Sequence, residues 1–144
     1  MKQIGIINGP NLGRLGQRQP EIYGTDSLDQ LNARLTRLFP GIRLRFYQSN
    51  HEGALIDQLE LWKDSGIDGV VINAGALTHQ SYALRDAVAA SDIPTVEVHI
   101  SNIYSREPFR AHSLLAPVVK GQITGLGLLG YQLAVQYLAD FIEG

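Results

Sequence analysis

Short apolar runs alternate with helical stripes along the chain. Continuous apolar runs are typical of strands buried on both faces, and apolar residues three and four positions apart mark one face of a helix. These patterns predict strands at residues 4–7, 42–47, 69–72, 95–100 and 118–123. They predict helices at residues 28–39, 52–65 and 78–91, and a C-terminal helix that follows the last strand and ends at about residue 142.

Capping signals refine these helix boundaries. Ser27 and Gln30 have the spacing of a capping box, and Pro40-Gly41 should end the first long helix. We expect a cap near Asn50 for the second helix and at Thr78 for the third.

The alternation of strands and helices predicts an α/β fold, a parallel sheet of five strands with helices on both faces. Right-handed crossovers favour the flavodoxin-like strand order. Segment 42–47 alternates apolar and polar residues, as an edge strand does. The sequence contains no internal repeat or linker, so we expect a single domain over residues 1–144.

Composition excludes several classes of function. Twelve Lys and Arg against fourteen Asp and Glu leave no basic excess for nucleic acid. Without cysteine there is no disulfide, thiolate metal site or Cys nucleophile. Asn8-Gly9-Pro10 interrupts the first apolar run too early for a signal peptide, and no run reaches the ~18 apolar residues of a membrane span. We therefore expect a cytoplasmic protein with no membrane partner.

The first strand is followed by a long segment, residues 8–25, without hydrophobic periodicity. Such loops are commonly lids over a binding site, and the glycines in this one could serve as hinges. Its polar side chains include Asn11, Arg14, Arg18 and Tyr23. A mobile surface loop with solvated arginines is the alternative interpretation.

In an open parallel sheet, ligands bind at the carboxyl ends of the strands. Glu97, His99 and Ser101 share one face of a strand that should be apolar on both. A buried carboxylate needs a partner, and a carboxylate beside an imidazole is a common acid–base device. A purely structural pair is the alternative, whereas two ligands are too few for a metal site.

Two further segments carry candidate binding residues. Asn73 and His79 flank small residues that would let a ligand approach the backbone, although a helix cap and a surface histidine explain them equally well. Arg106 and Arg110 follow the strand of Glu97 and suggest a carboxylate substrate, with a solvated charged turn as the alternative. The GxGxxG pattern at Gly125–Gly130 lacks a following strand with an acidic residue, so we interpret it as close strand–helix packing.

Together these motifs resemble the type II 3-dehydroquinate dehydratases, in order and over essentially the whole chain. One departure is Gly13-Arg14, where many members carry Asn and an apolar residue. The motifs are Asn8-Gly9-Pro10-Asn11-Leu12, Leu15-Gly16, Arg18, Pro20, Tyr23-Gly24, Gln48-Ser49-Asn50-His51-Glu52-Gly53, Asn73-Ala74-Gly75, Thr78-His79, Glu97-Val98-His99-Ile100-Ser101-Asn102, Arg106, Phe109-Arg110 and Gly125–Tyr131.

The resemblance implies anti elimination of water from 3-dehydroquinate through an enolate, giving 3-dehydroshikimate without a metal or organic cofactor. It makes Tyr23 the base, Arg18 its stabilising neighbour, and His99 the general acid oriented by Glu97. Asn11 would hold a water against the enolate oxygen. Both the shikimate pathway and quinate breakdown contain this step.

The same resemblance assigns binding residues and an assembly. Asp86 would reach the site of a neighbouring subunit, because the family forms trimers that pack into dodecamers. The substrate's hydroxyls and carboxylate would be bound by Asn73, His79, Arg110 and the backbone at Ile100 and Ser101.

A tyrosine needs help to act as a base, since a phenol has a reference pKa of about 10. A nearby arginine can shift a partner's pKa by about 1 to 3 units. Arg18 lies five residues from Tyr23, and Arg106 or Arg110 could contribute. With the base on the lid and His99 on the sheet, acid and base would flank opposite faces of the substrate ring.

The sequence leaves two rival functions open. Imine chemistry would need a lysine at a strand end, and Lys2, Lys63 and Lys120 lie elsewhere in the predicted fold. A binding or receiver-like module could share the fold, because fold alone does not fix function. A receiver needs acidic residues where this chain has Asn8-Gly9 and Asn73-Ala74-Gly75.

Overall fold

A computed structural model describes residues 1–143, which form an α/β structure around one five-stranded sheet. All neighbouring strands are parallel, in the order β2-β1-β3-β4-β5. The predicted flavodoxin-like arrangement is therefore confirmed. The strands are β1 (Gln3–Asn8), β2 (Arg43–Gln48), β3 (Gly69–Asn73), β4 (Thr95–His99) and β5 (Gly121–Thr124).

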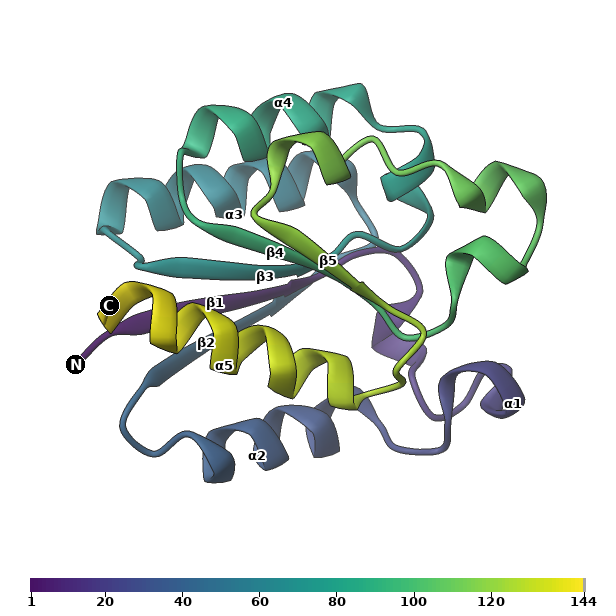
Figure 1. Ribbon diagram of the computed structural model, residues 1–144, viewed down its shortest axis with the longest axis horizontal. Coiled ribbons are helices and arrows are strands. Elements are labelled where there is room, and N and C mark those ends of the chain that lie inside the picture. Colours follow the sequence, from purple (N-terminus) through teal and green to yellow (C-terminus); the bar gives the residue numbers. More distant parts are fainter. Residues whose placement is uncertain (144) are drawn as a thin grey trace.

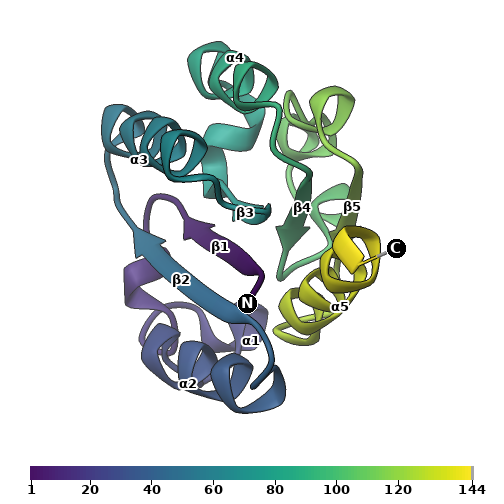
Figure 2. The same cartoon turned by 90° about the vertical axis from the view of Figure 1, so that its left-hand side faces the viewer.

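Helices cover both faces of the sheet (Figure 1). On one face α2 (Leu28–Leu38) and α5 (Leu129–Glu143) pack against the apolar side chains of the central strands. On the other face α3 (Glu52–Ser65) lies beside α4 (Tyr82–Ser91), as the view along the sheet shows (Figure 2). No helix within residues 1–143 is long and apolar enough to cross a membrane.

The central strands are buried on both faces, as their continuous apolar runs predict. On β1, Ile4 and Ile6 face α2 and α5, and Ile7 faces the opposite core. Gly5 also lies on that second side, where an added Cβ would come within 2.5 Å of the Trp62 ring of α3. The indole thus packs directly on the β1 backbone, which no larger residue at position 5 would permit.

Two predicted element boundaries and one predicted capping residue are wrong, whereas the predicted bounds of α3 are confirmed. Ser81, not Thr78, caps α4, because its hydroxyl accepts the Leu84 N–H and Thr78 belongs to a preceding 3-10 helix, Gly75–His79. Asn50 does not cap α3; its side-chain oxygen instead accepts the backbone N–H of Asn11, which ties the first loop to the end of β2. The last strand begins at Gly121 rather than at 118, since a 3-10 helix occupies Ala116–Val118.

Two other local predictions are confirmed. Ser27 and Gln30 form a reciprocal capping box at the start of α2. Gly130 packs closely between strand and helix, with Val98 and Ile123 at 3.3 and 3.4 Å from where its Cβ would lie. Gly125 and Gly127 adopt positive φ angles in the turn that precedes α5.

The strand register brings the polar strand ends together. Asn8 of β1 pairs with Asn73 of β3, and His99 ends β4 on the same edge of the sheet. The segment after β1 crosses this edge and contains a 3-10 helix, Leu12–Arg14, and one short helix, α1 (Pro20–Tyr23). The carboxyl edge of the sheet and this segment together enclose the candidate site.

Candidate active site

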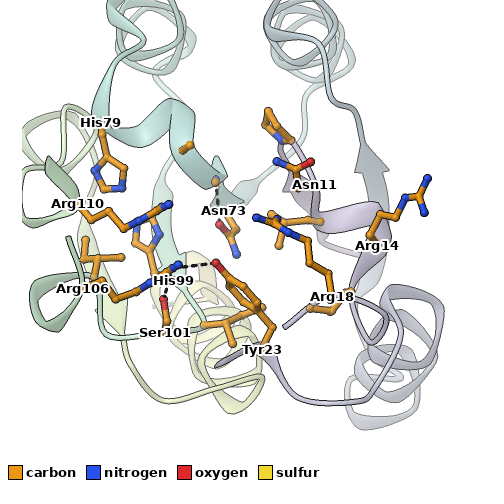
Figure 3. Close-up of a pocket in the computed structure, with 17 residues that line it drawn as sticks. Asn11, Arg14, Arg18, Tyr23, Asn73, His79, His99, Ser101, Arg106 and Arg110 are labelled. Carbon is orange, nitrogen blue, oxygen red and sulfur yellow. Dashed lines mark hydrogen bonds between the residues drawn. The ribbon is translucent and has the colours of Figure 1, made fainter. Parts of the chain in front are cut away.

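A cavity lies at the carboxyl ends of β1, β3 and β4, beneath the segment that follows β1 (Figure 3). The structure brings most of the predicted site residues to this cavity. Glu97 lies behind His99, and Asp86 is exposed on α4 away from the cavity. The predicted residues that line it are Asn11, Arg18, Tyr23, Asn73, His79, His99, Ile100, Ser101 and Arg110.

Tyr23 ends α1 and directs its phenol toward the loop after β4. The Nη1 group of Arg106 donates hydrogen bonds to the Tyr23 hydroxyl oxygen at 2.8 Å and to Ser101 Oγ at 3.2 Å (Figure 3). Arg18 also approaches the phenol, with its Cζ 6.0 Å from the ring centroid. The guanidinium that touches the phenol oxygen is thus that of Arg106, which the sequence reasoning named only as a helper.

His99 and Glu97 form the expected pair. The imidazole donates from Nε2 to Oε2 of Glu97 across 2.5 Å, and the carboxylate is fully buried. This contact occupies Nε2 and leaves Nδ1 as the ring nitrogen available to a ligand in the cavity. A charge-assisted hydrogen bond of this kind fixes the orientation and tautomer of the ring.

Two residues that the sequence reasoning missed complete the surroundings of Glu97. Ser113 Oγ donates to the carboxylate, with 2.8 Å to Oε2, and Gln122 Nε2 donates to Oε2 at 3.0 Å. Burial raises the pKa of Glu97, but the hydrogen bonds from His99, Gln122 and Ser113 outweigh it and hold the pKa below its ordinary value. The carboxylate therefore stays ionised and accepts the hydrogen bond from His99.

His79 lies at the end of the 3-10 helix after β3, with its ring stacked on that of His99 at 6.4 Å between centroids. Its Nδ1 donates to the backbone carbonyl of His112 at 2.8 Å. Burial lowers the pKa of His79 below 6.5, despite this hydrogen bond, and the nearby Arg110 acts in the same direction. A neutral His79 then offers Nε2 as a hydrogen-bond acceptor.

Positive charge dominates the cavity wall. Arg14, Arg18, Arg106 and Arg110 all line it, and no lysine or carboxylate among the described residues does. Arg14 points away from the other labelled side chains (Figure 3). Glu107 pairs with Arg110 at 2.7 Å and leaves a net positive surface, which suits an anionic ligand. The lack of a lysine in the lining counts against imine chemistry.

Asn73 and Asn11 contribute amide groups to the cavity wall. Asn73 ends β3, where its Oδ1 accepts the N–H of Gly75 at 3.1 Å. Asn11 adopts a left-handed backbone conformation, φ 72°, which asparagine tolerates better than most residues. Its backbone N–H is held by Asn50 at 3.0 Å, which leaves the side chain free to face the cavity.

Comparisons with known proteins identify the family of this chain. A family model described as dehydroquinase class II matches residues 2–139. A protein of Bacillus licheniformis named 3-dehydroquinate dehydratase is 57% identical over 142 residues, which cover 97% of each chain. One of the same name from Bacillus subtilis is 52% identical, over 96% of this chain and 94% of that one.

Solved structures are similar along the whole fold. The crystal structure of a type II dehydroquinase from Butyrivibrio crossotus superposes with a TM-score of 0.93 at 48% identity, covering 96% of this chain and 97% of the other. Sequence, fold and site thus lead to one conclusion: the chain belongs to the class II dehydroquinase family.

Proposed function

We propose that the chain removes water from 3-dehydroquinate to give 3-dehydroshikimate, using Tyr23 as base and His99 as general acid. The observation that carries this proposal is the placement of both groups in one cationic cavity. Each is hydrogen-bonded to a residue whose charge is opposite to that of its ionised form: the phenol to Arg106 and the imidazole to Glu97. The names and identities of the relatives support the substrate.

In the first step the Tyr23 phenolate takes a proton from the carbon beside the ketone. The electron pair of that C–H bond moves onto the ketone oxygen and forms an enolate. Arg106 and Arg18 stabilise the phenolate before this transfer. Asn11 would hold the water that stabilises the enolate oxygen, in keeping with its place on the cavity wall.

In the second step the enolate re-forms the ketone and expels the neighbouring hydroxyl. A protonated His99 gives the leaving oxygen a proton from Nδ1, so that it departs as water and leaves the conjugated enone. Glu97 stabilises the imidazolium before this transfer. A proton must then pass from Tyr23 back to His99, by way of solvent, before the next turnover.

The remaining polar groups are assigned to substrate binding. Asn73, His79, Arg110 and the backbone of Ile100 and Ser101 would contact the hydroxyls and the carboxylate. Asp86 would act across a subunit boundary in a dodecamer built from trimers, because it lies outside the cavity of its own chain. A cytoplasmic location and a place in the shikimate pathway or in quinate breakdown complete the proposal.

The decisive experiment is an absorbance assay with purified protein. Addition of 3-dehydroquinate should produce the ultraviolet absorbance of a conjugated enone, and a flat trace would favour a binding module instead. Borohydride added with the substrate should leave activity intact. Irreversible inactivation with the substrate attached to a lysine would revive imine chemistry.

A further inference from the structure

A fully buried phenol joins two strand ends beneath the cavity. Tyr131 lies in the first turn of α5 and exposes none of its surface. Its hydroxyl donates to Oδ1 of Asn8 at 2.6 Å and accepts from Nδ2 of Asn73 at 2.8 Å. Asn8 and Asn73 are register partners at the ends of β1 and β3. The mechanism proposed above uses neither Tyr131 nor Asn8.

The direction of these hydrogen bonds follows from one backbone group. The N–H of Gly75 can only donate, so the Asn73 atom that it meets must be the oxygen. The nitrogen of Asn73 therefore faces Tyr131 and donates to the phenol oxygen. The phenol must then donate its proton to Asn8 Oδ1. The three hydrogen bonds therefore run in one direction, from Gly75 through Asn73 and Tyr131 to Asn8.

Tyr131 is suited to a fixed, uncharged role. Burial raises its pKa well above the ordinary value, and the Asn73 hydrogen bond offsets this only in part. The hydroxyl therefore keeps its proton at neutral pH and donates to Asn8. A buried hydroxyl is costly without partners, and here both its donor and its acceptor capacity are used.

We propose that Tyr131 is a positioning residue for substrate binding, which holds the Asn73 amide so that its second N–H points into the cavity. This inference rests on the proposed function, since it supposes that Asn73 binds the substrate. Asn73 lines the cavity, and its oxygen and one N–H are already used by Gly75 and Tyr131. The remaining N–H suits an acceptor, a hydroxyl or carboxylate oxygen, whereas a reversed amide would present its own oxygen and repel a carboxylate.

The test is Tyr131→Phe, which keeps the ring in the core and removes the oxygen. The KM for 3-dehydroquinate should rise by about 5- to 30-fold, the effect of losing one oriented hydrogen bond, while kcat changes much less. Tyr137→Phe, on the exposed side of the same helix, is the matched control and should leave both constants unchanged. A lower melting temperature with an unchanged KM would mean that Tyr131 is only structural, and would overturn the proposal.

A double variant separates an effect through Asn73 from a general loss of packing. If Tyr131 acts through Asn73, then Tyr131→Phe combined with Asn73→Ala should have the KM of Asn73→Ala alone. Additive increases in KM would contradict the proposal. If Tyr131→Phe does not fold, Asn8→Ala is the alternative variant. It removes the oxygen that accepts the Tyr131 hydrogen bond and should raise the KM in the same way.

The test of Tyr131 and the test of the proposed dehydratase activity can fail independently. Wild-type protein that forms no enone would overturn the dehydratase assignment, whereas active wild-type protein with an unaffected Tyr131→Phe variant would overturn only the role of Tyr131. A crystal structure of Tyr131→Phe needs no activity. It should show the Asn73 amide displaced or in more than one orientation, and an unmoved amide would contradict the inference.

Discussion

Nη1 of Arg106 lies 2.8 Å from the phenol oxygen of Tyr23, although 83 residues separate the two in the sequence. The same nitrogen also reaches Ser101, so the guanidinium links the segment after β1 to the loop after β4. A cation that donates directly to a phenol oxygen favours the phenolate more than one at the distance of Arg18. We therefore expect Arg106 to be the main stabiliser of the proposed base.

Arg106→Gln should lower kcat more than Arg18→Gln, by about 10-fold or more, because Arg106, unlike Arg18, makes a charge-assisted hydrogen bond to the phenol. Steady-state kinetics on both variants would measure this difference. Arg43→Gln, at an exposed position of edge strand β2, is the control for loss of a positive charge. A larger loss of kcat in Arg18→Gln would return the principal role to Arg18.

Tyr23→Phe should lower kcat by about 10²- to 10⁴-fold, the usual contribution of a general base, with little change in substrate affinity. The ring would still pack at the edge of the core, and only the proton acceptor would be lost. Turnover and binding, the latter by calorimetry, would check the two effects separately. Near-normal turnover would show that another group removes the proton.

Glu97→Gln should lower kcat by about 10²- to 10⁴-fold, because an uncharged amide does not stabilise the imidazolium form of His99. The substitution keeps the size of the side chain in a fully buried place. Glu60→Gln, exposed on α3, is the matched control. Activity of Glu97→Gln close to wild type would show that the Glu97–His99 pair is structural.

The local pattern of the sequence predicts the sheet and most of its helices, because buried strands and amphipathic helices have different hydrophobic periods. It also predicts the Glu97–His99 pair, since two residues on one strand face must be neighbours. It does not fix the ends of strands and helices, because Thr78 and Ser81 are both good capping residues and only the folded chain distinguishes them.

The contacts that the sequence does not predict join residues far apart in the chain. Ser113 and Gln122 lie 16 and 25 residues from Glu97, and Tyr131 lies 58 residues from Asn73. Arg18 is nearer than Arg106 to Tyr23 in the sequence, which favoured it as the partner of the phenol. In the folded chain Arg106 is the residue that contacts the phenol oxygen. A signal did exist for Gln122, a polar residue on a strand that pairs in register with Glu97.

The protonation of His79 should make stability depend on pH. Burial first, and the positive charges of His99 and Arg110 after it, lower its pKa below 6.5. The unfolded chain therefore binds this proton more readily than the folded one, so the free energy of unfolding falls as pH drops below 6.5. Above that pH neither state is protonated and the effect is absent.

His79→Gln removes this dependence. The free energy of unfolding of the wild type, relative to that of the variant, should therefore fall as the pH is lowered from 7.5 to 5. Urea unfolding at several pH values would measure the change. A difference that stays constant, or that grows on acidification, would show that the pKa of His79 is not lowered in the folded protein.

Asp86 offers a test of the proposed assembly, because it is exposed on α4 and outside the cavity of its own chain. If it completes the site of a neighbouring subunit, Asp86→Ala should lose most activity although its own Tyr23 and His99 are intact. Light scattering of the wild-type protein should give a particle of twelve times the chain mass. A monomer that is fully active would contradict the shared site.

Mixed oligomers make that test specific. When Asp86→Ala and Tyr23→Phe chains are co-expressed, a site that takes Tyr23 from one chain and Asp86 from the next is intact in about a quarter of random arrangements. Two nearly inactive variants should then give about a quarter of wild-type activity. If Asp86 served its own chain, every site would lack one of the two groups, and the mixture would be no more active than the average of its parents.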